Sequence, residues 1–144
     1  TAMVRKNLSN AGFLNWQRAK AFAQTIIDEF DVRPPGPQSI ARSLSGGNLQ
    51  KYVIGREVLQ DPDVLIVNQP TWGVDAAAAA AIRQSLLDLA SKGAAIIVIS
   101  QDLDELMEIS TRFSALNNGK LSVAQTMAKF SLDEIGLLLG GADA

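Results

Sequence analysis

Cysteine and histidine are both absent from the 144 residues. Their absence excludes disulfide bridges, thiolate and imidazole metal ligands, and acid–base chemistry that depends on an imidazole. Long apolar runs are also missing, because the longest, residues 64–67 and 94–99, are far shorter than the roughly 20 residues that span a bilayer. Residues 1–10 are polar and lack the apolar region of a signal peptide. The sequence therefore predicts a soluble chain without a membrane span.

Charge of one sign is not in excess either. The 13 Lys and Arg residues nearly balance the 15 Asp and Glu residues, which gives a formal charge of -2 and a pI near 5.0. Binding to a phosphate backbone normally needs a basic face, so no nucleic-acid partner is expected. The 47% of hydrophobic residues are enough to bury one core.

Residues 15–30 have apolar side chains at helical spacing, which predicts an amphipathic helix. Pro34, Pro35 and Pro37 cannot continue a helix and predict an extended linker behind it. A second helix is expected over residues 48–59, with its apolar side chains on or near one side. Those side chains are Leu49, Tyr52, Val53 and Leu59.

Two short apolar runs without alternation, residues 64–67 and 94–99, are typical of strands covered on both faces. Between them, Asp75 is a candidate N-cap for a helix that reaches about Ser91 and stops at Gly93. Strand, helix and strand in this order predict a parallel sheet and an α/β fold.

The C-terminal part combines a helix, a hairpin and a second helix. The first helix is expected over residues 103–109. Residues 113–116 and 121–124, joined by the turn-forming residues 117–120, predict a hairpin. Ser131 is a candidate cap for a last helix over residues 132–139, which Gly140 and Gly141 end.

Four segments carry the chemistry of this chain. They are Leu-Ser-Gly-Gly-Asn-Leu-Gln-Lys at 44–51, Asp-Pro-Asp-Val-Leu-Ile-Val-Asn-Gln-Pro-Thr at 61–71, Gly-Val-Asp at 73–75 and Ile-Ser-Gln at 99–101. In order and spacing they resemble the signature loop, Walker B strand, D-loop and switch strand of an ABC-transporter ATPase. The Gly-Gly-Asn variant looks most like the second cassette of twin-cassette importers for simple sugars and nucleosides. Asn68-Gln69-Pro70 favours the nucleoside-type branch.

The resemblance implies a partial P-loop NTPase-like fold, with a helical subdomain and a parallel-sheet core followed by a C-terminal hairpin and helix. It also implies a division of the chain. Residues 1–40 would complete the helical subdomain and its linker, residues 41–124 would form the cassette core, and residues 125–144 would hold the last helix. The helix at 15–30 would belong to the part that meets the membrane subunit, although a helix that faces an ordinary core has the same pattern.

Ser45, Gly46 and Gly47 precede a helix, where free backbone N–H groups and the helix dipole favour an anion such as phosphate. A capped helix start with glycines in the turn is the plain structural alternative. The resemblance implies that this loop, with Asn48, reaches across a dimer of cassettes to the γ-phosphate of ATP held by the other cassette. It also implies that Asp75 contacts the opposite cassette, besides its possible role as a helix cap.

The three hydrolytic positions of the family hold neutral side chains here. Asn68 replaces the aspartate that orders Mg²⁺, Gln69 the glutamate that polarises the attacking water, and Gln101 the switch histidine. A missing general base typically costs about 10²- to 10⁴-fold in rate. We therefore expect the ATP site built from this Walker B segment to hydrolyse ATP weakly or not at all. The alternative is that these amide side chains only cap a strand. Trp72 is expected to pack in an interface.

A phosphate-binding Gly-x-x-x-x-Gly-Lys-Ser/Thr loop is absent from the sequence. In the family this loop precedes the helical subdomain, so the chain is interpreted as a fragment that begins midway through a cassette. Such a fragment is not expected to hydrolyse ATP by itself, and it is expected to expose apolar surface and self-associate. Lys51 and Arg56 are expected to be solvated on the signature helix.

The sequence thus favours the ATP-binding subunit of an importer, a peripheral protein on the cytoplasmic face of the membrane that uses ATP and Mg²⁺. Its expected partners are an opposite cassette, membrane-spanning permease subunits and, indirectly, a periplasmic or lipoprotein solute-binding protein. Two alternatives stay open at this point: a regulatory module with the cassette fold but no transport role, and an interaction domain that binds no nucleotide.

Overall fold

The computed structural model describes residues 8–10, 13–33 and 36–140. The chain divides into two compact units, Thr1–Gln101 and Asp102–Ala144, which are described separately. The first unit holds all four motif segments. Its elements are β1 (Ser9–Asn10), β2 (Phe13–Leu14), α2 (Trp16–Glu29), the 3-10 turn η1 (Ala41–Ser43), α3 (Gly46–Val58), β3 (Val64–Asn68), α4 (Ala76–Ser91) and β4 (Ala95–Ile99).

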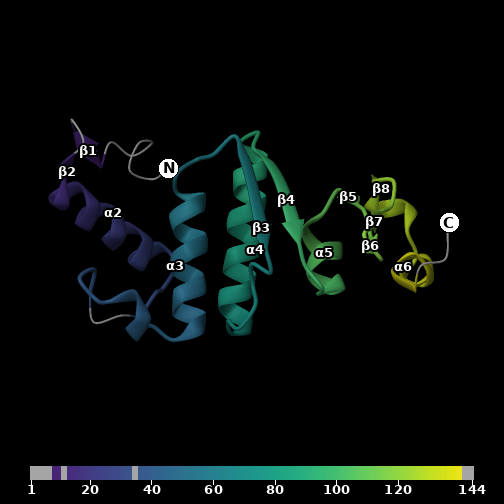
Figure 1. The fold of residues 1–144 in the computed structure, drawn as a ribbon, viewed down its shortest axis with the longest axis horizontal. Helices are drawn as coiled ribbons and strands as arrows, with labels where there is room; N and C mark the ends of the chain where they lie inside the picture. Colours follow the sequence, from purple (N-terminus) through teal and green to yellow (C-terminus); the bar gives the residue numbers. More distant parts are fainter. Residues whose placement is uncertain (1–7, 11–12, 34–35, 141–144) are drawn as a thin grey trace. The chain divides into compact units, whose positions relative to one another are not determined.

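The predicted parallel sheet is confirmed. Strands β3 and β4 pair in parallel, with Val64 opposite Ala95 and Asn68 opposite Ile99. Helix α4 connects them and packs against β4, and α3 lies beside α4 (Figure 1). Asp75 caps α4, and Gly93 follows its end with a φ of 102° that glycine adopts without strain. Both ends of this helix are therefore where the sequence predicts them.

Only one face of the sheet is covered, so the expectation of strands buried on both faces is wrong for the described residues. Leu65 and Val67 are buried, whereas the intervening Ile66 is 62% exposed. Ile97, which pairs with Ile66 on the adjacent strand, is 53% exposed. Because side chains alternate along a strand, the apolar run supplies both a core face and an open apolar face.

Helix α2 begins where Asn15 accepts a hydrogen bond from the backbone N–H of Arg18, at 3.0 Å. It ends at Glu29, and Asp31 then takes a left-handed backbone conformation with φ of 44°. The chain is therefore already out of the helix before the proline-rich segment. Pro34 and Pro35, which the sequence uses to predict the stop, lie outside the described residues.

The buried face of α3 differs from the predicted one. The helix buries residues at i, i+3, i+4 and i+7, whereas Leu49 is exposed and Tyr52 and Val53 are half-buried. The buried residues are Lys51, Ile54, Gly55 and Val58. Gly55 provides the reason, because an added Cβ would lie 2.6 Å from the Phe30 ring. The close approach of α2 at a residue without a side chain selects this face for burial.

The second unit contains α5 (Leu103–Ile109), β5 (Arg112–Phe113), β6 (Leu116–Asn117), β7 (Lys120–Leu121), β8 (Gln125–Thr126), the turn η2 (Met127–Lys129) and α6 (Leu132–Gly140). The hairpin is confirmed in a shorter form. Strands β6 and β7 are joined by Asn118 and Gly119, both with positive φ. Phe113 belongs instead to β5, which pairs with β8.

Ser131 caps α6 as predicted, and its hydroxyl accepts the Glu134 N–H at 3.2 Å. Gly141, part of the predicted stop, lies outside the described residues. The division of the chain into 1–40, 41–124 and 125–144 stays a prediction. No helix in the described part of the chain has both the length and the apolar character needed to cross a bilayer.

Candidate functional site

The signature segment forms the start of α3. Ser45 is its N-cap, and the serine Oγ accepts a hydrogen bond from the Asn48 N–H at 3.4 Å. Gly46 and Gly47 are the first two helical residues, so their N–H groups have no partner within the helix ladder. Ser45 and Gly46 are exposed. The arrangement provides exposed donors at the positive end of a helix, which suits an anion.

The two glycines have different surroundings. A Cβ on Gly47 would lie 2.9 Å from the carbonyl oxygen of Gly73, in the D-loop segment. A Cβ on Gly46 would meet no atom within 4 Å. Gly47 is therefore required by the approach of two segments of this chain, whereas nothing within 4 Å in the described structure requires a glycine at position 46.

Gln50 connects the signature helix to the end of the Walker B segment. Its Nε2 donates to the carbonyl oxygens of Gln69 and Pro70, each at 3.0 Å. Pro70 itself is fully buried. The two motifs are thus joined directly by hydrogen bonds. The sequence does not point to this role, because the partners are 19 and 20 residues away and carbonyl oxygens belong to every residue.

The structure places Asn68, Gln69 and Gln101 at the carboxyl ends of β3 and β4. Asn68 is the last residue of β3, and the Gln69 N–H donates to the Ile99 carbonyl at 2.7 Å. Gln69 has a φ of 50°, and its carbonyl also accepts from Trp72 N–H. Asn68 and Gln101 are exposed. Ligands of open α/β sheets bind at this edge.

Asp75 caps α4 by accepting the Ala78 N–H at 2.9 Å, which confirms the predicted cap. This hydrogen bond is the main cause that lowers the pKa of Asp75 below its ordinary value of 3.8, and the positive charge of Lys51 lowers the pKa further. Asp75 is exposed and stays ionised at neutral pH. Its contact with an opposite cassette stays a prediction.

Lys51 is not solvated, contrary to expectation. It is only 7% exposed, and its Nζ donates to the Asp31 carbonyl at 3.0 Å and lies 3.6 Å from Asp31 Oδ2. The Arg33 guanidinium donates to the same carboxylate and is the main cause that lowers the pKa of Asp31. The positive φ of Asp31 directs the chain toward α3, where a buried charge finds its partner.

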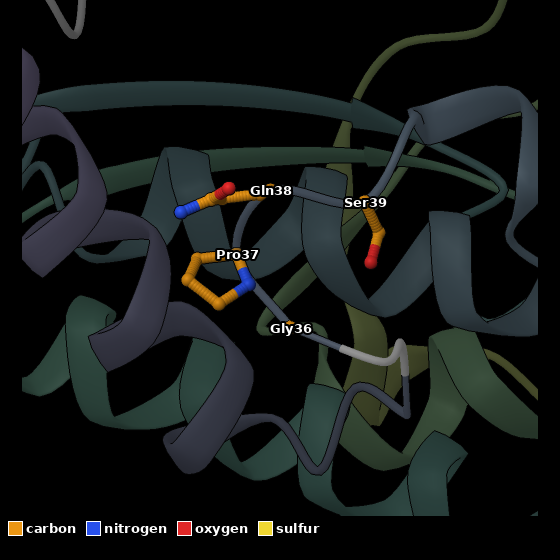
Figure 2. Close-up of a pocket in the computed structure, with 4 residues that line it drawn as sticks. All are labelled: Gly36, Pro37, Gln38 and Ser39. Atoms are coloured by element: carbon orange, nitrogen blue, oxygen red, sulfur yellow. The ribbon is translucent and has the colours of Figure 1, made fainter.

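Trp72 is 76% exposed within this chain, and Arg56 is exposed and pairs with Glu57. A pocket of the structure is lined by Gly36, Pro37, Gln38 and Ser39, all from one turn (Figure 2). It holds no charged side chain and none of the predicted site residues. Within the described ranges, no cluster of acidic side chains suitable for a metal ion is present.

The sequence is similar to ATP-binding proteins of importers. It is 38% identical over 136 residues to the nucleoside import ATP-binding protein NupA of Lactococcus lactis subsp. cremoris, covering 94% of this chain and 27% of that protein. It is 36% identical over 138 residues to the guanosine import ATP-binding protein NupO of Bacillus subtilis, covering 96% and 27%. The chain spans about a quarter of the length of these relatives. It matches no family model.

Similarity extends to an ATP-binding protein of sugar import and to solved structures. The galactose/methyl galactoside import ATP-binding protein MglA of Escherichia coli is 40% identical over 119 residues, which are 83% of this chain and 24% of that protein. The dimeric ATP-binding cassette MJ0796 bound to ADP and Pi superposes with a TM-score of 0.70 at 21% identity, over 88% of this chain and 56% of that one. The fold is that of ABC ATPase cassettes, which confirms the expected fold class.

Proposed function

We propose that this chain, which belongs to the ATP-binding proteins of ABC importers, contributes its signature loop to an ATP site shared with an opposite cassette. The protein that contains it would couple ATP binding and hydrolysis to the uptake of simple sugars or nucleosides. The named roles of NupA, NupO and MglA support both solute classes. A dimeric cassette among the similar structures supports a site formed by two cassettes.

The observation that carries this proposal is the start of α3. Ser45 and Gly46 are exposed beside the helix N-terminus, and Gly46 has open space around it. Nothing nearby in the described structure needs a glycine there, and we take the close approach of a ligand as its reason. Phosphate oxygens gain from both the free N–H groups and the helix dipole. The loop therefore suits the γ-phosphate of a nucleotide held by another cassette.

The half of the site at the sheet edge would be hydrolytically weak. Asn68, Gln69 and Gln101 lie at the edge where the chemistry belongs, but none can take a proton at neutral pH. An amide oxygen carries no net charge, so Asn68 would bind Mg²⁺ more weakly than a carboxylate would. We assign the stronger hydrolysis to the site that receives this chain's signature loop.

The remaining partners follow from this role. The chain would lie on the cytoplasmic face of the membrane as a peripheral subunit, bound to permease subunits that receive the solute from a periplasmic or lipoprotein binding protein. ATP and Mg²⁺ are the cofactors of the assembled protein. The relatives named as import ATP-binding proteins support this arrangement.

The signature assignment is tested with Gly46→Asp in the assembled transporter. The new side chain finds space in this chain, so folding is expected to be retained, but it fills the proposed phosphate position with a negative charge. ATPase activity should fall about 10²-fold or more, as for loss of a transition-state donor. Gly136→Asp, at a helix glycine that also has open space, is the matched control and should keep full activity. Unchanged hydrolysis in Gly46→Asp would contradict the assignment.

The asymmetry is tested with Gln69→Ala in the same assay. Because an amide is no base, its removal should change turnover by no more than about threefold, whereas removal of a true general base costs about 10²- to 10⁴-fold. The comparison is the variant that removes the corresponding glutamate of the opposite cassette. Equal losses in the two variants would show that this half is catalytic.

A further inference from the structure

The Asn48 side chain bridges two segments of the first unit. Its Oδ1 accepts the backbone N–H of Arg33 at 3.0 Å, and its Nδ2 donates to Ser45 Oγ at 3.0 Å. Asn48 is half-buried, while Ser45 is exposed. The amide group thus links the segment that follows α2 to a proposed phosphate-binding residue.

The hydrogen-bond chemistry fixes the direction of the amide. A backbone N–H can only donate, so the end that faces Arg33 must be the oxygen. The nitrogen therefore faces Ser45 Oγ and donates to it. The same Oγ also accepts the Asn48 backbone N–H at 3.4 Å. A hydroxyl has two lone pairs and one hydrogen, so both acceptor sites are in use and the O–H remains free to donate.

We infer that Asn48 is a positioning residue, which holds the Ser45 hydroxyl as a hydrogen-bond donor toward the phosphate. This inference rests on the proposed function of the signature loop and adds the means by which its serine is oriented. A phosphate oxygen can only accept, so a serine whose O–H pointed back into the chain would be of no use to it. The same amide links that orientation to Arg33, in the segment that follows α2.

Capping of α3 alone does not need this side chain. The cap is the bond from the Asn48 backbone N–H to Ser45 Oγ, which any residue except proline would supply at position 48. In a capping box the third helical residue would instead accept the N–H of the cap residue. The Asn48 amide makes neither bond; it contacts the serine hydroxyl and a residue 15 positions away.

The test is Asn48→Asp in the assembled transporter. An aspartate has the same shape and keeps an acceptor for the Arg33 N–H, but its second oxygen cannot donate. The Ser45 O–H then turns to the carboxylate and is lost to phosphate. A carboxylate in the first turn favours the helix, so thermal stability should be unchanged or higher. ATPase turnover should fall at least about tenfold, as for loss of one charge-assisted hydrogen bond.

A double-mutant cycle with Ser45→Ala separates positioning from charge repulsion. If Asn48 acts through the serine hydroxyl, Ser45→Ala with Asn48→Asp should be no slower than Ser45→Ala alone. A simple repulsion of phosphate by the new charge would slow the double variant further and would overturn the inference. Asn118→Asp, the same change in an exposed turn, is the matched control and should be fully active.

The two hypotheses fail in different ways. Full activity in Ser45→Ala would count against the proposed function, because the serine would then make no important contact with nucleotide. A slow Ser45→Ala together with a fast Asn48→Asp would leave the proposed function in place and overturn the positioning role. Loss of thermal stability in Asn48→Asp would also overturn it, since the side chain would then serve the fold.

Discussion

At the scale of single residues, the two glycines in the first turn of α3 have different surroundings. Gly47→Ala would bring a Cβ to 2.9 Å from the Gly73 carbonyl oxygen, and two backbone segments would have to separate. We expect it to lower the free energy of unfolding by about 1–3 kcal/mol, as overpacking does. Gly46→Ala should be neutral or slightly stabilising, because its Cβ has open space. Urea unfolding of both variants is the measurement, and equal losses would contradict the contact.

Asp75 should make the stability of the first unit depend on acid. Its pKa is lowered in the folded chain, chiefly by the Ala78 N–H, so its stabilising effect is complete above the ordinary pKa of 3.8. The effect is lost as pH falls through the lower, folded-state pKa. Asn is an equally good helix cap but does not titrate, so Asp75→Asn should remove this part of the acid dependence. The measurement is the unfolding midpoint of the parent chain and of Asp75→Asn from neutral pH to about pH 3, and the midpoint of the variant should depend less on acid.

Among site residues, those whose partners are local in sequence are the ones that could be predicted. Ser45 and Asp75 each cap a helix through an N–H three residues ahead, and this spacing is visible in the sequence. Gln50 and Lys51 bind carbonyl oxygens 19 to 20 residues away. Carbonyl oxygens leave no mark in a sequence, so neither contact could be predicted from residue types.

At the scale of elements, the packing of α2 on α3 depends on Gly55. A Cβ there would lie 2.6 Å from the ring of Phe30, the C-cap residue that follows α2. We expect Gly55→Ala to lower the free energy of unfolding by about 1–3 kcal/mol despite the better helix propensity of alanine. In a Phe30→Leu background the clash is relieved, and the same change should cost much less. If chemical unfolding shows that the free-energy losses of Gly55→Ala and Phe30→Leu simply add, the contact is contradicted.

Helix ends were predictable because caps and stops are local, but the buried face of α3 was not. The apolar side chains of α3 suggest that residues 49, 52 and 53 face the core, whereas Lys51 and Gly55 are buried. Lys51 is buried because its ammonium group contacts the carboxylate and the carbonyl oxygen of Asp31. Gly55 is buried because the ring of Phe30, the C-cap of α2, packs against it. Both causes are tertiary contacts, and these override the periodicity of a single helix.

At the scale of the whole molecule, the open face of the β3–β4 sheet is the largest departure from the sequence prediction. An apolar run without alternation predicts burial on both faces, but residue types alone do not show whether another element packs on the second face. Four β-strand side chains on that face are between 53% and 62% exposed: Val64, Ile66, Ile97 and Ile99. Contiguous apolar surface of this kind marks an interface or a site of aggregation.

The 144-residue chain by itself should therefore self-associate through this face, and the double variant Ile66→Thr with Ile97→Thr should reduce that association. Threonine keeps the β-branch that suits a strand but reduces the apolar surface exposed to water. Sedimentation velocity over a range of concentrations should show more monomer, with little change in thermal stability. Val67→Thr, on the buried face of the same strand, is the control: it should lower stability, because it buries a hydroxyl, and leave association undiminished. If the double variant associates as strongly as the parent chain, the sheet face is not the surface involved.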